Sequence, residues 1–373
     1  DWLMMKINMR RLCFYMSAPM ALSLLSACGS GSSGSNNQST PQAVNYAPFS
    51  CPGANNVSFP GISGVRGVDG VESQVYVTGV YVQYGANHGF LYQGSVTGGG
   101  VCNQLNYPSS PGVTVTSTSP YGPDNNGAGK VVVVGSYTTL ESGALTQLGM
   151  LYQGAADGST TSGYTTLNPQ SLTAESVINT LGHSTMGGIV VGNYDTRLLT
   201  GQAFIYNINT GAYYSLTKPG SSASITAYGI WYNGGTSYTI TGGYSAVDQG
   251  GTNLGFITDW DSATQQISHF KTLNYNNMPA SVIGTHFEGI TGDGNGGYNL
   301  AGDWQYIGQP TTPSFANISR NPDGSFATPT WTGFAYYPGA SWTSANTVYK
   351  NYILGLYQMG TPTYDYGYVA TIN

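Results

Sequence analysis

Residues 190–194 read Val-Val-Gly-Asn-Tyr, and residues 202–206 read Gln-Ala-Phe-Ile-Tyr. Both runs are rich in the β-branched and aromatic residues that favour strands. Their separation suits two antiparallel strands joined by a short loop. This stretch therefore predicts a β-hairpin, and it decides the fold because the rest of the chain repeats it.

The same pair of runs occurs six times. In each copy an aliphatic run ends in Gly-x-aromatic, and a second β run begins ten to fourteen residues after the glycine. Successive motif glycines are 56, 57, 50, 60 and 53 residues apart. Self-similarity at such an interval indicates a repeat architecture. The six copies are Gly79-Val80-Tyr81, Gly135-Ser136-Tyr137, Gly192-Asn193-Tyr194, Gly242-Gly243-Tyr244, Gly302-Asp303-Trp304 and Gly355-Leu356-Tyr357.

Two further elements complete each unit. One precedes the Gly-x-aromatic run, and the other follows the hairpin with an aromatic residue, an apolar residue and a Pro, as in Tyr213, Leu216 and Pro219. Four short strands in about 55 residues describe one blade of a β-propeller. After the first 27 residues, apolar residues do not recur with the 3.6-residue period of a helix, which excludes a helical solenoid. A parallel β-helix is also excluded, because its units would repeat at a shorter interval.

The ends of the chain predict how the ring closes. The sixth unit stops after its third strand, at residues 366–372. Tyr46, Phe49 and Pro52 repeat the spacing found in the outer elements of other units, so residues 45–51 are expected to complete the last blade. Closure would remove two unpaired edges. The predicted fold is all-β: a six-bladed β-propeller of four-stranded antiparallel blades, the last completed by the N-terminal strand.

The motif residues have an expected structural role. A glycine removes a Cβ where another chain segment must come close, and we expect that segment to belong to the next blade. The aromatic residue two positions later points to the same face of the strand, where it is expected to be buried between blades. The alternative is a ring of exposed aromatic residues that stack on sugars.

Composition excludes several classes. The 373 residues include 54 Gly and 30 Tyr, and only 7% are charged. A disordered chain needs low hydrophobicity and high net charge. A nucleic-acid binder needs a basic face, which ten Lys and Arg against sixteen Asp and Glu do not supply. No nucleic acid is therefore expected as a partner, and the polar surface suits neutral ligands.

The first 27 residues have the features of an export signal. Lys6 and two Arg residues precede a mostly apolar run that is too short to span a bilayer. The run ends in Leu-Ser-Ala-Cys-Gly at 25–29, which resembles the bacterial lipobox. The resemblance implies that Cys28 is acylated and that the chain is cut just before it. An unmodified Cys at the end of an ordinary signal is the alternative.

The remaining chain divides into a tether and a body. Residues 28–44 are mostly Gly, Ser, Asn and other small or polar residues, as in flexible linkers, and residues 45–373 form the predicted propeller. In lipoproteins, Asp after the acylated Cys is the usual inner-membrane signal, so Gly29 favours the outer membrane. We expect a lipid-anchored outer-membrane protein facing either the periplasm or the cell surface.

The units also resemble the HAF family of bacterial extracellular repeats. The third unit matches best, with residues 192–194 followed by Gln202-Ala203-Phe204-Ile205-Tyr206. The fifth departs from the pattern at Trp304 and at Ala316-Asn317. Because the motif residues of that family are structural, the resemblance implies a surface or secreted propeller and no catalytic residue.

Cys51 and Cys102 are the candidates for a disulfide. Export to an oxidising compartment favours a bond between them. Alignment of neighbouring blades, however, separates the two residues by about eight positions, which is farther than a disulfide spans. The sequence leaves the pairing open.

One cluster is a candidate ligand site. Thr285-His286-Phe287-Glu288 precedes the predicted inner strand of the fifth unit, and Tyr121 and Tyr228 occupy equivalent places in other units. Residues at the start of inner strands surround the mouth of a propeller channel. Tyr121, Tyr228, His286 and Glu288 are therefore predicted to bind a ligand, and ordinary loop packing is the alternative.

Other motifs carry no site. Residues 292–297 match G-x-G-x-x-G but lead into a strand rather than a helix, so they predict a turn. The acidic residues at 259–261 lack the calcium-loop pattern, and the His spacing fits no metal site. No nucleophile elbow is present. The sequence therefore predicts no cofactor, no metal and no catalytic residue. Sugar hydrolysis would need two acidic residues near one mouth of the channel, and Glu288 and Asp303 are the pair to test for it.

These observations favour a lipid-anchored propeller that is not an enzyme and that binds a glycan or a surface protein. The first alternative is an exported glycan-active hydrolase on the same scaffold. Converging acidic residues at the channel would favour the hydrolase, whereas aromatic and amide groups alone would favour binding. The second alternative is a structural envelope protein without a small-molecule site.

Overall fold

The computed structural model describes residues 44–51, 58–68, 71–125, 129–246, 252–275, 282–308, 310–360 and 364–373. The regular elements in these ranges are strands, apart from two short 3-10 helices, η1 (Thr161–Gly163) and η2 (Gln170–Leu172). The predicted all-β class is confirmed. No helix in these ranges is long and apolar enough to cross a membrane. The export signal, Cys28 and the tether up to residue 43 lie outside the described residues and stay predictions.

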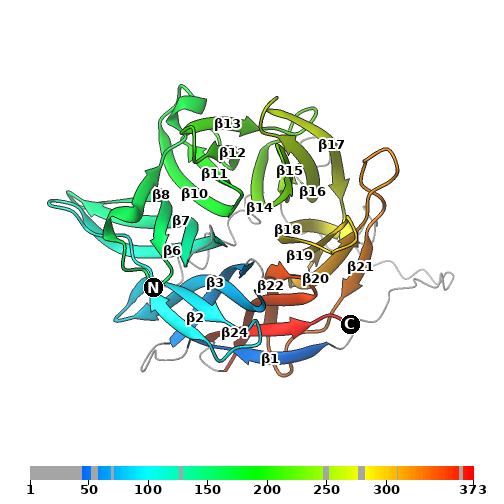
Figure 1. Ribbon diagram of the computed structural model, residues 1–373, viewed down its shortest axis with the longest axis horizontal. Helices are drawn as coiled ribbons and strands as arrows, with labels where there is room; N and C mark the ends of the chain where they lie inside the picture. The colour runs from blue at the N-terminus through cyan, green and yellow to red at the C-terminus, as the bar shows by residue number, and fades with distance from the viewer. Residues whose placement is uncertain are drawn as a thin grey trace, which may run out of the picture.

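The described strands form sheets arranged around a central axis (Figure 1). One sheet has four antiparallel strands in sequence order, with its first strand nearest the axis. Its strands are β2 (Ser58–Val68), β3 (Val71–Gln83), β4 (Ala86–Gly94) and β5 (Val101–Gln104).

Two larger sheets each contain two antiparallel groups of four strands. In each case one parallel pair joins the groups, β8 to β10 in the first sheet and β16 to β18 in the second. The strands of the first sheet are β6 (Thr114–Asn125), β7 (Lys130–Glu141), β8 (Ala144–Ala155), β9 (Tyr164–Leu167), β10 (Val177–Met186), β11 (Ile189–Thr196), β12 (Gln202–Asn207) and β13 (Ala212–Leu216). Those of the second are β14 (Ser224–Gly234), β15 (Ser237–Ser245), β16 (Asn253–Asp261), β17 (Gln266–Leu273), β18 (Val282–Gly292), β19 (Tyr298–Tyr306), β20 (Thr312–Ile318) and β21 (Thr330–Gly333).

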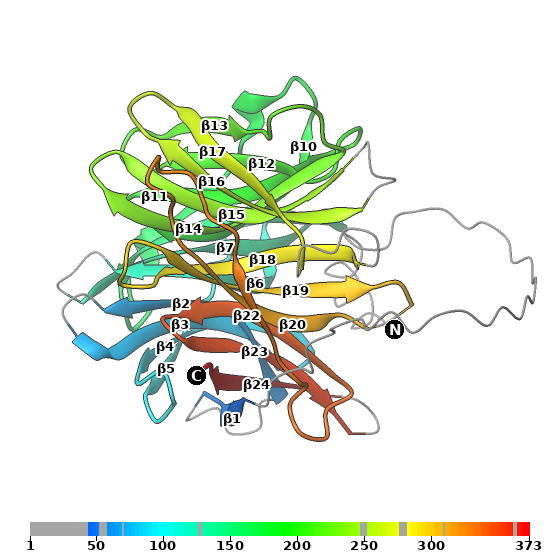
Figure 2. The same cartoon turned by 90° about the vertical axis from the view of Figure 1, so that its right-hand side faces the viewer.

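The last sheet joins the two ends of the body. Its order is β22, β23, β24 and β1, and β1 pairs antiparallel with β24 from Asn45 opposite Thr371 to Phe49 opposite Gly367. Figures 1 and 2 both show β1 beside β24 at the margin of the molecule. This is the pairing that the spacing of Tyr46 and Phe49 predicts. The strands are β1 (Asn45–Phe49), β22 (Trp342–Tyr349), β23 (Tyr352–Met359) and β24 (Tyr364–Thr371).

The motif glycines admit a close approach, but the approaching segment differs from the expected one. A Cβ on Gly302 would lie 1.9 Å from the carbonyl oxygen of His286, and a Cβ on Gly242 would lie 2.0 Å from that of Thr226. In both cases the carbonyl belongs to the neighbouring inner strand of the same sheet, not to the next blade. The expectation was wrong because the inner strand is distorted at this point, as described below.

The motif aromatic residues are buried, as predicted, with exposed fractions of 5–8%. Three of them stack on a Tyr from the segment that leads into an inner strand. The ring centroids are 3.6 Å apart for Tyr107–Tyr137, 4.1 Å for Tyr275–Trp304 and 3.8 Å for Tyr337–Tyr357. Burial on this scale leaves these rings no face for a sugar.

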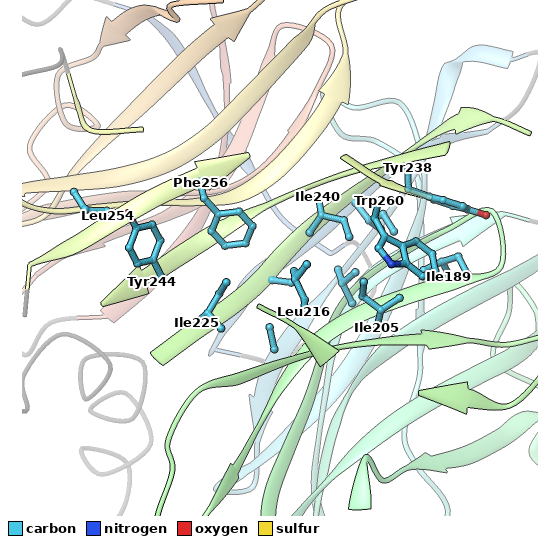
Figure 3. Packing of buried hydrophobic residues seen from close by; sticks show 14 of the residues in the cluster. Ile189, Ile205, Leu216, Ile225, Tyr238, Ile240, Tyr244, Leu254, Phe256 and Trp260 are labelled. Atoms are coloured by element: carbon cyan, nitrogen blue, oxygen red, sulfur yellow. The ribbon is translucent and has the colours of Figure 1, made fainter. Parts of the chain in front are cut away.

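The core lies between facing sheet surfaces rather than in one central layer. Figure 3 shows such a layer, in which residues of β11–β13 pack on residues of β14–β16. Because strand side chains alternate between faces, each sheet contributes to the layer on either side of it. The labelled members are Ile189, Ile205, Leu216, Ile225, Tyr238, Ile240, Tyr244, Leu254, Phe256 and Trp260.

Cys51 and Cys102 form a disulfide, with their Cα atoms 5.5 Å apart. Cys51 follows β1, the outer strand of one sheet, and Cys102 lies in β5, the outer strand of the neighbouring sheet. The eight-position offset inferred from aligned blades does not apply, because the chain leaves β1 directly beside β5. The bond therefore ties the closing strand to the adjacent sheet.

Candidate functional site

Six strands surround the axis: β2, β6, β10, β14, β18 and β22. Each contacts the next, and β22 contacts β2, so these described strands form a closed cycle. Their ends converge on the centre of Figure 1. Side chains that leave this cycle towards the axis are therefore brought together from all parts of the sequence.

Each of the six strands is irregular at the point opposite a motif glycine. There the pairing with the second strand skips a position of the inner strand, as in a β-bulge. Bulges of this kind redirect a side chain out of the regular pleat. We call the skipped side chains the bulge residues: Ser63, Tyr121, His183, Tyr228, Glu288 and Asn346.

Four bulge residues and His286 form a chain of contacts. The rings of Tyr121 and His183 are 5.1 Å apart, those of His183 and Tyr228 are 4.6 Å apart, and those of Tyr228 and His286 are 5.6 Å apart. His286 Nε2 lies 3.1 Å from Glu288 Oε1. The structure thus brings Tyr121, Tyr228, His286 and Glu288 into one cluster, whose binding role stays a prediction.

The position of this cluster differs from the expected one. The sequence places these residues just before the inner strands, at the channel mouth. In the structure Tyr121, Tyr228 and Glu288 lie well inside β6, β14 and β18. The expectation failed because the bulge interrupts the alternation of apolar and polar residues along the strand. In the sequence, residues from the middle of the strand therefore look like residues that precede it.

Asp303 completes the cluster from the second strand of its sheet. It lies opposite His286 in the pairing of β18 with β19. The side chain is buried, and Oδ1 accepts the backbone N–H of Ala345 at 3.0 Å. Burial raises the pKa of Asp303 to about 7, with a further rise from the charge of Glu288, against the opposing effect of His286. This carboxyl therefore keeps its proton close to neutral pH.

His286 is the second proton carrier. Burial lowers its pKa, but the hydrogen bond and charge of Glu288, together with the charge of Asp303, raise it further than burial lowers it. The result is a pKa above that of an ordinary His. Glu288, by contrast, has a side chain that is 24% exposed. The cluster therefore combines a partly exposed carboxyl with two buried groups whose pKa values are raised.

A small cavity lies against this cluster. Its volume is about 10 Å³, which is room for about one water molecule, and its lining includes Glu288, His183, Tyr228 and Arg66. Arg66 reaches from β2 across the axis, where Nη2 donates to the carbonyl oxygen of Ile230 at 3.1 Å. Burial lowers the pKa of Arg66, but a guanidinium stays charged in proteins.

His183 and Arg66 were not singled out from the sequence. The distance along the chain from a bulge residue to its motif glycine varies with the hairpin between them, so His183 lies nine residues before Gly192 and Ser63 lies sixteen before Gly79. A bulge residue is identified only when it is known which residue of the inner strand pairs with the motif glycine. The sequence does not give this pairing, because the length of the hairpin between the two strands is not known from it.

The rejected motifs have structural roles. Residues 292–297 connect β18 to β19, and Asp293 Oδ1 accepts the backbone N–H groups of Asn295 and Gly297 at 2.7 and 2.9 Å. This is the predicted turn. Among the described residues, no group of three His, Cys, Asp or Glu side chains could hold a metal ion.

Chemically, the cluster can exchange a proton at one partly exposed carboxyl group. Carboxyl groups whose environments separate their pKa values are the usual acid and base of hydrolytic sites. Glu288 contacts the cavity, whereas Asp303 and His286 are buried and have raised pKa values. The ring of Tyr228 lies against His286, and the ring of Tyr121 lies against His183.

Comparison with known proteins gives structural likenesses only. No family model and no curated protein matches the sequence. A mannose phosphorylase from Leishmania mexicana is 14% identical, with a TM-score of 0.40 over 70% of this chain and 85% of that one. YCF48 from Cyanidioschyzon merolae is 7% identical, with a TM-score of 0.42 over 88% and 99%. The family 117 glycoside hydrolase Zg3597 from Zobellia galactanivorans is 10% identical, with a TM-score of 0.40 over 88% and 90%.

These likenesses contradict one expectation from the sequence. The chain was expected not to be an enzyme, yet glycoside hydrolases are among the solved structures that it resembles. At such identities and TM-scores the likenesses assign no activity to this chain. Its function is argued below from its own residues.

Proposed function

We propose that the protein is a glycan-active hydrolase whose reactive group is Glu288 at the axis of a six-bladed propeller. One observation carries the proposal: the partly exposed carboxyl of Glu288 adjoins His286 and Asp303, two buried groups whose pKa values are both raised. Glycoside hydrolysis needs carboxyl groups held in different protonation states. The residues of this cluster meet that need.

In this proposal each group has a separate role. Glu288 lines the water-sized cavity, where its carboxylate takes a proton from the attacking water and passes that proton to the sugar oxygen that leaves as the glycosidic C–O bond breaks. His286 orients Glu288 through the 3.1 Å contact. Asp303 is a positioning residue, which acts on Glu288 through His286. The aromatic faces of Tyr121 and Tyr228 flank the site where a neutral sugar ring would stack.

The setting of this domain is also proposed. The six antiparallel groups of four strands correspond to six blades, in agreement with the six sequence repeats and the HAF resemblance. Acylation of Cys28 would display the propeller from the outer membrane through the tether at 28–44. Metabolic labelling with a clickable fatty acid tests this, because label on the wild type that is lost in Cys28→Ser supports the anchor. Wild-type protein without label contradicts it.

The hydrolase is tested with the purified full chain and a panel of neutral oligosaccharides and polysaccharides, by release of reducing ends. We expect at least one glycan to be cleaved. Glu288→Gln should lower kcat by about a hundredfold or more, which is the usual contribution of a general acid or base. Glu175→Gln is the matched control, because Glu175 is an exposed carboxylate in the loop before β10.

Two outcomes would overturn the proposal: no cleavage of any glycan by the wild-type chain, or full activity in Glu288→Gln. Asp303→Asn should instead move the pH profile of kcat, since it removes a proton carrier that does not touch the substrate. An unchanged profile would remove Asp303 from the site and leave Glu288 alone.

Glycan binding without cleavage is the second candidate. The small axial cavity favours it, because 10 Å³ holds a water molecule but no sugar ring, so a glycan bound outside this cavity would not have its glycosidic bond at Glu288. A glycan that binds the wild-type chain, survives intact and loses affinity in Tyr228→Ala would support binding alone.

A further inference from the structure

A second and larger cavity lies between two neighbouring groups of strands, β14–β17 and β18–β21. Its volume is about 580 Å³, within the range of small-molecule sites. The end of β14, the start of β15 and the connection from β18 to β19 contribute to its wall. We call it the interblade pocket; its lining includes Trp231, Asn233, Ser237, His269, Tyr298 and Arg320.

The charges in this pocket cancel. Arg320 forms a bidentate pair with Asp259, with Nη2–Oδ1 and Nη1–Oδ2 distances of 2.7 and 2.8 Å. Burial raises the pKa of Asp259, but hydrogen bonds from Arg320, Thr239 and His269 lower it by more. Asp259 is therefore ionised, and the guanidinium of Arg320 is paired with it. Because each charge is neutralised by the other, this part of the pocket wall does not favour a charged ligand.

His269 presents a ring nitrogen to the pocket. Its Nδ1 lies 2.8 Å from Asp259 Oδ2. An ionised carboxylate only accepts hydrogen bonds, so Nδ1 carries a proton and Nε2 is the ring nitrogen left to hydrogen-bond a ligand hydroxyl. Nε2 makes no hydrogen bond within the described part of the chain. The backbone of His269 has φ of 53°, a conformation that most residues avoid, and the contact with Asp259 accompanies this unusual placement.

The other polar groups are similarly fixed. Tyr298 Oη donates to Asn233 Oδ1 at 2.7 Å, and Arg320 Nη2 donates to Tyr298 Oη at 2.8 Å. Asn233 Nδ2 donates to Thr239 at 2.9 Å. A ligand would meet preoriented groups rather than mobile side chains, which lowers the entropy lost on binding.

Trp231 separates the pocket from the axis. Arg66, which lines the axial cavity, lies 5.4 Å from the centroid of the Trp231 ring. A Cβ on Gly292 would come within 2.9 Å of the indole, so the glycine lets the ring lie close to β18. The half-buried indole gives the pocket an aromatic surface, to which the apolar face of a sugar ring is suited.

We propose that the interblade pocket binds one ring of a neutral, hydroxyl-rich ligand, namely a pyranose unit of a glycan. The pocket has room for such a ring, the charges cancel, Trp231 supplies the apolar contact and His269 Nε2 is placed to hydrogen-bond a hydroxyl group. Glu288 and Gly292 lie four residues apart on β18, about 13 Å. The pocket is thus a separate site from Glu288, and its ligand is bound whether or not cleavage occurs.

Binding is measured by isothermal titration of the full chain carrying Glu288→Gln, which removes cleavage from the readout. The probes are glucose, galactose, mannose, xylose and N-acetylglucosamine with their β-linked disaccharides, and glucuronic acid as a charged counterpart. At least one neutral probe should bind. His269→Gln and Ser237→Ala should each weaken it, His269→Gln by about tenfold. His88→Gln, in a different sheet, should change affinity less than twofold.

Several results would overturn this inference: no binding of any neutral probe, tighter binding of glucuronic acid than of its neutral counterpart, or unchanged affinity in both His269→Gln and Ser237→Ala. If His269→Gln lowers Tm, the Ser237→Ala variant decides. Absence of cleavage by the wild-type chain, together with retained binding here, would contradict the proposed hydrolase and leave the pocket standing.

Discussion

Gly302 explains what the repeated motif encodes. Its missing Cβ makes room for the carbonyl oxygen of His286, which approaches because β18 bulges at Glu288. The same arrangement accompanies the other motif glycines, so each glycine is the counterpart of a bulge on the facing strand. In the sequence, a motif glycine indicates a strand. In the structure, the same glycine also indicates which residue of the facing strand has a side chain towards the axis.

Substitution of a motif glycine should be severe. In Gly242→Ala the new Cβ would lie 2.0 Å from the carbonyl oxygen of Thr226, and backbone on both strands would have to shift. We expect a loss of at least about 3 kcal/mol in the free energy of unfolding, at the upper end for overpacking, measured by urea denaturation. Gly211→Ala is the control, because its φ is 72° and its Cβ meets open space, so strain of about 1–2 kcal/mol is expected. Equal losses in both variants would refute the steric account.

The raised pKa of Asp303 predicts how stability depends on pH. Between its ordinary pKa of 3.8 and about 7, the folded chain binds this proton and the unfolded chain does not. Stability from this group is therefore complete below pH 4 and is lost as pH rises to 7, by about 4 kcal/mol at most. His286, whose pKa is also raised, acts in the same direction.

Asp303→Asn should remove most of this dependence. The amide cannot ionise, and its oxygen can still accept the N–H of Ala345. We expect the variant to be more stable than the wild type at pH 8 and to lose that advantage at pH 4, as measured by urea unfolding at both values. Glu141→Gln, which changes an exposed carboxyl at the end of β7, should leave the difference between pH 8 and pH 4 as it is in the wild type. If the free energy of unfolding of Asp303→Asn changed with pH by the same amount as that of the wild type, burial of the Asp303 charge would not be the cause of the pH dependence.

At the residue scale, the sequence predicts which residues are buried or lie together better than it predicts where they lie along the strands. Burial of Tyr81 and Trp304 follows from an aromatic residue two places beyond a strand glycine. The association of Tyr121 with Tyr228 and His286 follows from comparison of equivalent units. The role of His183 could not be predicted, because a bulge leaves no mark in composition and hairpin lengths differ between units.

At the scale of elements, β1 is the strand with the longest reach in sequence. It pairs with β24 more than three hundred residues away, and Phe49 packs its ring 4.9 Å from that of Tyr92 in β4. The spacing of Tyr46 and Phe49 was enough to predict the partner strand. It was not enough to place Cys51 beside Cys102, because that contact depends on where the chain turns after β1.

The disulfide should contribute substantially to stability. It joins residues 51 positions apart, and a loop of that length contributes about 4 kcal/mol in the chain-entropy model. The Cys51→Ser/Cys102→Ser double variant should unfold at a lower urea concentration under oxidising conditions. Addition of a reductant should lower the midpoint of the wild type and leave that of the double variant unchanged. A wild type insensitive to the reductant, with its bond shown by mass spectrometry to be reduced, would contradict this.

For the whole molecule, the ring is the property that the sequence predicts most directly. Six copies of one unit, each with apolar faces on both sides, bury those faces only when the last unit meets the first. In the structure, the inner strands from β2 to β22 contact one another in turn and β22 contacts β2, so the last unit does meet the first. The interblade pocket could not be predicted in this way. It depends on Asp259 and Arg320, which belong to no repeated position and meet across two groups of strands.

Closure by β1 can be tested with the strand supplied separately. A chain that starts at residue 52 lacks the partner of β24, whose N–H and C=O groups would become an exposed edge. It would also lose Phe49, which is 2% exposed and whose removal alone should cost about 3–5 kcal/mol. We expect this truncated chain with Cys102→Ser to melt at a lower temperature than a chain that starts at residue 44 and carries Cys51→Ser and Cys102→Ser, so that loss of the disulfide does not enter the comparison. A synthetic peptide of residues 44–51 with Cys51→Ser should raise the Tm of the truncated chain further as its concentration rises, by mass action, whereas the same peptide with Phe49→Ala should have much less effect. If truncation left Tm unchanged, or both peptides acted alike, β1 would be an accessory strand and the ring would be held by its inner contacts alone.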